Sequence, residues 1–182
     1  MNRAHDAHQP RWTSVHKLLH WIVAVAVILQ LALGFELGDL ADEDPERTEV
    51  LRLHATTGVT ILALMLVRLG WRLTHAVPAP PATLGPALSR GARAIHLAFY
   101  VSLIVLPVSG LLLVAASGNR VPLLGADLPG FGPASDALRT TLWYVHAVFA
   151  IATSVMVLGH IGAALRHALL RDGTFSRMLP WG

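Results

Sequence analysis

The stretch TTLWYVHAVFAIATSVMVLGHIGAAL, residues 140–165, contains no charged side chain over its 26 residues. A transmembrane helix needs roughly 20 largely apolar residues, so this stretch is long enough to cross a bilayer. Its two histidines, His146 and His160, lie 14 residues apart. On a helix this spacing is about 21 Å along the axis and about 40° short of four full turns. Both imidazoles are therefore predicted to lie on one side of the helix, in opposite leaflets.

Three further runs of similar length precede this one. Residues 18–35 and 94–117 carry no charge, and residues 53–71 are interrupted only by Arg68, which we expect to extend to the lipid headgroups. No segment has the alternation of apolar and polar residues that is typical of a membrane β-barrel. The sequence therefore predicts an all-α integral membrane protein, a four-transmembrane-helix bundle that forms a single membrane domain over residues 1–182. With their flanks, the predicted spans cover about residues 14–36, 53–73, 92–117 and 140–166.

The composition agrees with a membrane protein and excludes several kinds of site. Of the 182 residues, 54% are hydrophobic and only 14% are charged, against about 25% charged in an average soluble domain. The chain has no cysteine, which excludes disulfides, thiolate metal sites, iron–sulfur clusters and covalent haem attachment through a C-x-x-C-H motif. Its basic residues are dispersed among the helix flanks, so no basic domain for nucleic acid is predicted.

The distribution of charge predicts the orientation in the membrane. Ten of the fourteen Lys and Arg residues lie in the N-terminal tail, the second loop and the C-terminal tail, counted with their flanks. The first and third loops, with their flanks, hold nine of the eleven acids. Because basic loops remain in the cytoplasm, both termini are predicted to be cytoplasmic. The third loop, residues 119–136, is rich in Pro and Gly and is expected to be an irregular external cap.

Five histidines lie in or at the ends of the spans, at positions 20, 54, 96, 146 and 160. One such residue is more often a hydrogen-bonded core histidine than a ligand, but ionisable groups at membrane depth are rare and usually face the bundle interior with a partner. With the termini inside, His20, His96 and His160 lie at the cytoplasmic ends of their helices, and His54 and His146 lie at the outer ends. One histidine pair can therefore form at each face of the membrane.

The surroundings of these histidines favour haem over zinc. Zinc takes four protein ligands, or three and a water, and no Cys, Asp or Glu accompanies the histidines inside the membrane. Haem supplies four nitrogens of its own and needs only one or two axial histidines. Small residues allow a porphyrin to approach, and the candidates, which also suit ordinary helix packing, are Gly34, Gly58, Gly110 and Gly162. Haem propionates need cations near the surface, and those available are Arg68, Arg72 and Arg93 inside and Arg52 and Arg139 outside. Arg72 is the candidate that we single out, although for any one of these arginines the favoured role is to set the topology.

Five ordered segments resemble the bacterial cytochrome b561 family: HW at residues 20–21, RLHATTGVTILALMLVRLGWRL at 52–73, HLAFYVSLIVLPVSG at 96–110, WYVH at 143–146 and GHIGAALRH at 159–167. The terminal RDGTFSRMLP, residues 171–180, is also similar, so the resemblance covers nearly the whole chain. It implies a multi-pass protein of the bacterial inner membrane that holds two b-type haems. By the resemblance, His20 and His160 would ligate the iron of the cytoplasmic haem, and His54 and His146 the iron of the outer haem.

Two other histidines are candidates for the acceptor site. His96 could replace His20 or His160 as a ligand, whereas the resemblance leaves it, like His167, as a candidate to contact a quinone headgroup or a propionate. A further group is expected to lie in water and to take no part: His5, His8, His16 and His75.

Two methionines are also near the sites. Met65 and Met156 could ligate iron in principle, but a flexible thioether is better suited to filling apolar gaps.

The resemblance implies electron transfer between a periplasmic reductant and the ubiquinone pool, and it is strongest to the superoxide oxidase type. That type is an oxidoreductase that passes electrons from superoxide to ubiquinone. Superoxide is an anion, and a positive approach would speed its capture, yet the first external loop holds six acids between residues 39 and 49 against Arg47 alone. A non-enzymatic electron-relay subunit for a periplasmic redox protein or dehydrogenase is therefore the alternative. A haem-free scaffold or transporter is the third hypothesis.

Overall fold

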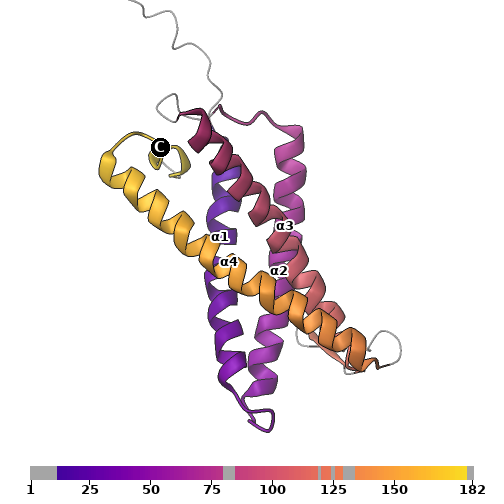
Figure 1. Cartoon of the computed structure of the whole chain (residues 1–182). Helices are drawn as coiled ribbons and strands as arrows, with labels where there is room; N and C mark the ends of the chain where they lie inside the picture. The colour runs from indigo at the N-terminus through magenta and orange to yellow at the C-terminus, as the bar shows by residue number, and fades with distance from the viewer. Residues whose placement is uncertain (1–11, 80–84, 119, 124–125, 129–133, 180–182) are drawn as a thin grey trace, which may run out of the picture.

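The structure is a computed structural model that describes residues 12–79, 85–118, 120–123, 126–128 and 134–179. Four long helices make up most of it (Figure 1): α1 Ser14–Asp39, α2 Arg47–Thr74, α3 Pro86–Ala116 and α4 Asp136–Leu170. All four are long and apolar enough to cross a membrane, which confirms the predicted all-α membrane bundle. The predicted spans lie within these helices, except that α3 ends one residue earlier, at Ala116.

Local sequence signals mark several helix ends. The side chains of Thr13 and Ser135 cap α1 and α4 by accepting hydrogen bonds from backbone N–H groups of the first turn. Pro86 begins α3, where a missing N–H costs nothing. Arg171 ends α4 in the left-handed conformation, with φ 51°. A 3-10 helix, η1 Ser176–Met178, follows.

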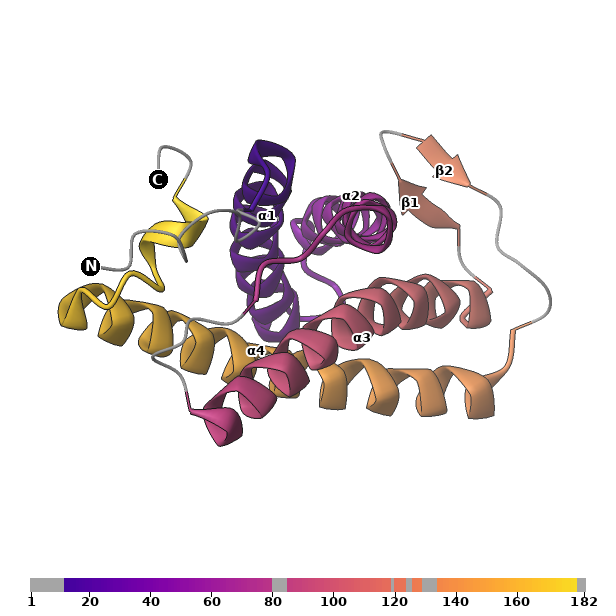
Figure 2. The ribbon, with the colours of Figure 1, turned by 90° about the horizontal axis from the view of Figure 1, so that it is seen from above.

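The helices pack in a series. Helix α1 packs on α2, α2 on α3 and α3 on α4, whereas no comparable packing joins α4 to α1 or α2 in the described residues. Seen from above, α3 and α4 lie together on one side and α1 and α2 on the other (Figure 2). Helix α1 begins and α4 ends at the same end of the bundle, which we call the termini end (Figure 1). We call the opposite end, where α1 connects to α2 and α3 connects to α4, the hairpin end.

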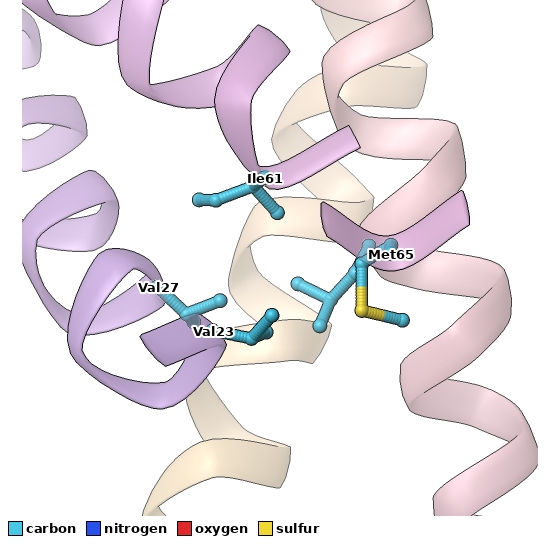
Figure 3. Packing of buried hydrophobic residues seen from close by; sticks show 5 residues of the cluster. Val23, Val27, Ile61 and Met65 are labelled. Atoms are coloured by element: carbon cyan, nitrogen blue, oxygen red, sulfur yellow. The ribbon is translucent and has the colours of Figure 1, made fainter. Parts of the chain in front are cut away.

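A small apolar core lies midway along the helices. Val23 and Val27 of α1 pack with Ile61 and Met65 of α2 and Leu103 of α3 (Figure 3). Met65 is only 1% exposed, so it fills the core as the sequence predicts. On each of these helices the core residues lie between the positions of the site residues described below.

The third loop contains more structure than we expected. Strands β1 Val121–Leu123 and β2 Ala126–Leu128 form an antiparallel hairpin that packs on α2. This corrects the prediction of an irregular cap. The strands can pair because only two residues separate them, which is the length of the commonest hairpin connection. The guanidinium of Arg52 on α2 lies 3.4 Å from the carboxylate of Asp127 on β2 and ties the hairpin to the helix.

Candidate cofactor sites at the two ends of the bundle

At the hairpin end, His54 of α2 faces His146 of α4, and their ring centroids are 6.2 Å apart. Each ring stands against a glycine of a neighbouring helix. A Cβ atom at Gly34 of α1 would lie 3.2 Å from Cε1 of His54, and one at Gly110 of α3 would lie 3.1 Å from Cε1 of His146. Both distances are shorter than ordinary carbon contacts, so these positions suit residues without a side chain.

At the termini end, His20 of α1 and His160 of α4 have the same ring separation, 6.2 Å. His96 of α3 also lies beside His160, at 5.9 Å, and Phe99 packs against the same ring at 5.5 Å. The ring separations therefore permit either His20 or His96 as the partner of His160.

Arg68 is not where the sequence predicts it. Instead of extending to the headgroups, its Nη2 lies 3.2 Å from Nδ1 of His20, and its guanidinium lies over the ring of Tyr100, 5.8 Å from the centroid. Arg72 lies over the same ring at 5.7 Å. The reason is helical register. Arg68 follows His54 by 14 residues and so shares the helix face that is directed into the bundle.

The same spacing recurs on all four helices. Fourteen residues are about four turns and about 21 Å, so each helix presents one residue to each end of the bundle. The pairs are His20 and Gly34, His54 and Arg68, His96 and Gly110, and His146 and His160. Sequence reasoning used this spacing only on the last helix. Applied to the other three, it places Arg68 on the inward face and singles out Gly34 and Gly110, the two glycines beside histidine rings.

The residues present fit a metal held between two imidazoles. A histidine nitrogen binds a first-row metal at about 2 Å, so two imidazoles on opposite sides of one metal have ring centroids about 6 Å apart. Both pairs have this separation, and in the described residues both join helices that pack on each other less than consecutive helices do. Among the described residues, no three His, Asp or Glu side chains gather to hold a bare ion. A haem, which brings its own equatorial nitrogens, therefore fits better than zinc.

Hydrogen bonds around the hairpin-end pair are incomplete. The hydroxyl of Ser109 lies 3.1 Å from Nδ1 of His146, and the amide nitrogen of Gln30 donates to Nε2 of His54 at 3.0 Å. Nδ1 of His54 and Oε1 of Gln30 are buried and have no partner in the described part of the chain. Buried polar atoms are normally satisfied, so this is a place where a further group is expected.

His167, the other acceptor candidate, lies in the last turn of α4, away from the paired rings. Its Nδ1 is 2.6 Å from Oδ2 of Asp172. Hydrogen bonds from the backbone N–H of Thr174 and from His167 lower the pKa of the Asp172 carboxyl to about 2. His167 lines a cavity of about 410 Å³ at the termini end, and the other lining residues are Ala168, Arg171, Gly173, Phe175 and Ser176.

Two histidines that we expected in water are packed instead. His16 is only 5% exposed, and its Nδ1 lies 3.0 Å from the hydroxyl of Thr13. The ring of His75 stacks on that of Trp71 at 3.7 Å. Helices α1 and α2 extend past their apolar runs, and their ends pack together, which the charge pattern does not show. His5 and His8 lie outside the described residues.

The remaining candidates from the sequence are two glycines and one methionine. A Cβ atom at Gly58 would contact Gln30 and Pro107, whereas Gly162 has no neighbour within 4 Å and so supports no close approach. Met156 is half-buried.

Comparison with known proteins agrees with this arrangement. A profile described as prokaryotic cytochrome b561 matches residues 11–181. Cytochrome b561 homolog 2 of Escherichia coli K12 is 30% identical, over 93% of this chain and 91% of that protein. Cytochrome b561 homolog 1 of the same strain is 27% identical, over 93% and 97%. The probable superoxide oxidase CybB of Yersinia pestis is 28% identical, over 89% and 92%. From its paired histidines on four membrane-spanning helices and a match over nearly its whole length, the chain belongs to the prokaryotic cytochrome b561 family.

Proposed function

We propose that this protein carries two b-type haems and passes electrons from a reductant at the hairpin end to ubiquinone at the termini end. Membership of the family establishes haem b and electron transfer across the membrane. The observation that supports two haems is that both ends of the bundle have the same geometry, two imidazoles with ring centroids 6.2 Å apart. His54 and His146 would hold one haem, and His20 and His160 the other.

When bound, the two haems supply a one-electron redox centre at each end. The chain's own residues position these centres. His146 and His160, which lie about 21 Å apart along α4, would each hold one of them, Ser109 orients the ring of His146, and the apolar cluster around Met65 lies between the two ends. Arg72, at the termini end, would contact a propionate.

The termini end would face the cytoplasm of a bacterial cell, because most of the Lys and Arg residues flank the helices there. Its cavity supports a quinone site. Asp172 engages Nδ1 of His167, which leaves Nε2 to meet a quinone oxygen, and Phe175 adds an aromatic wall. Reduction of a quinone to a quinol consumes protons, and imidazole is the side chain that exchanges protons near neutral pH. His96, beside His160, is the second candidate for contact with the acceptor.

We favour superoxide as the donor, so the protein would be a superoxide:ubiquinone oxidoreductase. This assignment draws on the similarity to a protein described as a probable superoxide oxidase. An anion is captured faster when cations surround the entrance. At the hairpin end Arg52 and Arg139 are available, but each pairs with a carboxylate, Arg52 with Asp127 at 3.4 Å and Arg139 with Asp136 at 3.8 Å.

These ion pairs, together with the acidic first loop, favour a second candidate. A non-enzymatic relay that receives electrons from a basic periplasmic redox protein or a dehydrogenase would use the acidic surface for docking. The Asp42 side chain, for example, is 88% exposed, although it pairs with Arg47 at 3.3 Å. Attraction between opposite charges of this kind speeds association and weakens with added salt.

Two measurements on the purified protein test the proposal. A haem assay with a reduced-minus-oxidised spectrum should give two low-spin b-type haems per chain, and His54→Ala or His160→Ala should remove one. A wild-type protein with no haem or only one haem, or a haem content that does not change in the Ala variants of His20, His54, His146 and His160, would refute the dihaem assignment. In stopped-flow mixing with superoxide and a quinone, haem reduction must outpace the spontaneous decay of superoxide. If it does not, superoxide is not the donor, and reduction by a cationic redox protein that slows as salt is added would identify the relay.

A further inference from the structure

The two histidine pairs differ in the charge of the side chains that contact them. At the termini end, the guanidinium of Arg68 lies 3.2 Å from Nδ1 of His20. At the hairpin end the contacts are neutral. They are the amide of Gln30 on His54 at 3.0 Å and the hydroxyl of Ser109 on His146 at 3.1 Å. Among the described contacts, a fixed positive charge therefore touches the termini-end site and not the hairpin-end site.

In the part of the chain that the structure describes, no carboxylate compensates Arg68. The described ion pairs involve other residues. The second contact of Arg68 is the face of Tyr100, which attracts a cation without cancelling its charge. Arg72 adds another guanidinium over the same ring. Arginine cannot be deprotonated in proteins, so this charge is permanent.

We infer that Arg68 makes the termini-end site the stronger electron acceptor and thereby directs electrons toward that end of the bundle. The inference rests on the proposed function, since it requires a haem at each histidine pair. A haem that takes up an electron becomes more negative, and a nearby positive charge stabilises that state. The interaction is stronger inside a protein than in water because the surroundings screen it less. Arg68 is thus a residue that tunes the site through its charge beside His20, without being a ligand.

The test is a potentiometric titration of the full-length protein with both haems bound. Arg68→Gln should change the reduction equilibrium of one haem at least tenfold, which lowers its midpoint potential by about 59 mV or more for one electron. The midpoint potential of the other haem should not change. Arg68→Lys keeps the charge and should shift the potential by less than half as much. Arg90→Gln is the matched control, because it removes one positive charge from an exposed position at the start of α3, and it should move neither potential.

Single-site variants assign the potentials and do not depend on Arg68 variants being stable. His54→Ala should leave the haem with the higher of the two wild-type potentials, and His160→Ala the haem with the lower one. The inference is overturned by the reverse order, by an unchanged or equally lowered pair of potentials in Arg68→Gln, or by an equal shift in Arg68→Lys. An unchanged pair would also be the result if a propionate cancelled the charge of Arg68. A wild-type protein without haem would instead refute the proposed function.

Discussion

His54 on α2 and His146 on α4 face each other with ring centroids 6.2 Å apart, although in the described residues α2 and α4 pack on each other less than consecutive helices do. His20 on α1 and His160 on α4 repeat this relationship at the other end. Facing imidazoles therefore join α4 to α2 at one end and to α1 at the other. A group bound between the rings would complete the bundle as well as carry electrons.

Haem removal should accordingly loosen the contact of α4 with α1 and α2. A ligand that binds only the folded protein at a thousand times its Kd adds about 4 kcal/mol of stability. We expect the haem-depleted protein in detergent to unfold at a clearly lower temperature than the holoprotein. Hydrogen exchange should rise in α1 and α2 more than in α3 and α4, which pack on each other most extensively. Equal unfolding temperatures for both forms would contradict this role.

Gly110→Ala should disturb the hairpin-end site alone. The added Cβ would lie 3.1 Å from Cε1 of His146, so the ring must turn away from its present position. Changes to residues that orient metal ligands typically cost 10–100-fold in affinity. We expect a loss of this order in the affinity for one of the two haems, measured by haem titration of the haem-depleted protein. Gly162→Ala is the control, because nothing lies within 4 Å of that position. Equal effects of the two substitutions would argue against the glycine cradle.

Met65→Ala should destabilise the bundle by about 2 kcal/mol or more, the lower limit for truncating a buried methionine. Met65 is 1% exposed in the apolar cluster, and the loss would be mainly of packing contacts, since lipid is as apolar as the core. Leu158→Ala, at a residue that is 71% exposed, should cost less than about 0.5 kcal/mol. Unfolding in detergent, followed by circular dichroism, compares the two. A cost for Leu158→Ala that matches the Met65→Ala cost would show that this cluster is not the core.

The segment after α4 should loosen in acid. Hydrogen bonds from Thr174 and His167 hold the pKa of Asp172 at about 2 in the folded protein, below its ordinary 3.8. The stabilisation is therefore fully present above pH 3.8 and is lost as the pH falls through 2. Because Trp21 donates to the carbonyl of Met178 at 2.8 Å, its fluorescence should change over that window, measured as the difference from Trp21→Phe.

The matched variant for this acid transition is Asp172→Asn, which cannot ionise. Its Trp21 signal should stay flat between pH 4 and 2. A transition that persists in Asp172→Asn would assign the effect to another group.

Much of the arrangement could be predicted because it is local in the sequence. Uncharged runs of sufficient length specify the spanning helices, and the height of each residue in the membrane follows from counting along a helix at 1.5 Å per residue. Counting thus places His54 and His146 at one end, and His20, His96 and His160 at the other. The Pro- and Gly-rich third loop has no such period, and its hairpin was missed.

What only the tertiary structure decided is how each helix is rotated about its axis against the others. That rotation depends on side chains from all four helices at once, so no single segment encodes it. It turns Arg68 inward to His20, sets Gly34 and Gly110 against the hairpin-end imidazoles and buries His16. It also brings both His20 and His96 within reach of His160. Composition and spacing determined which chemistry lies at each depth, and packing decided which side chains touch.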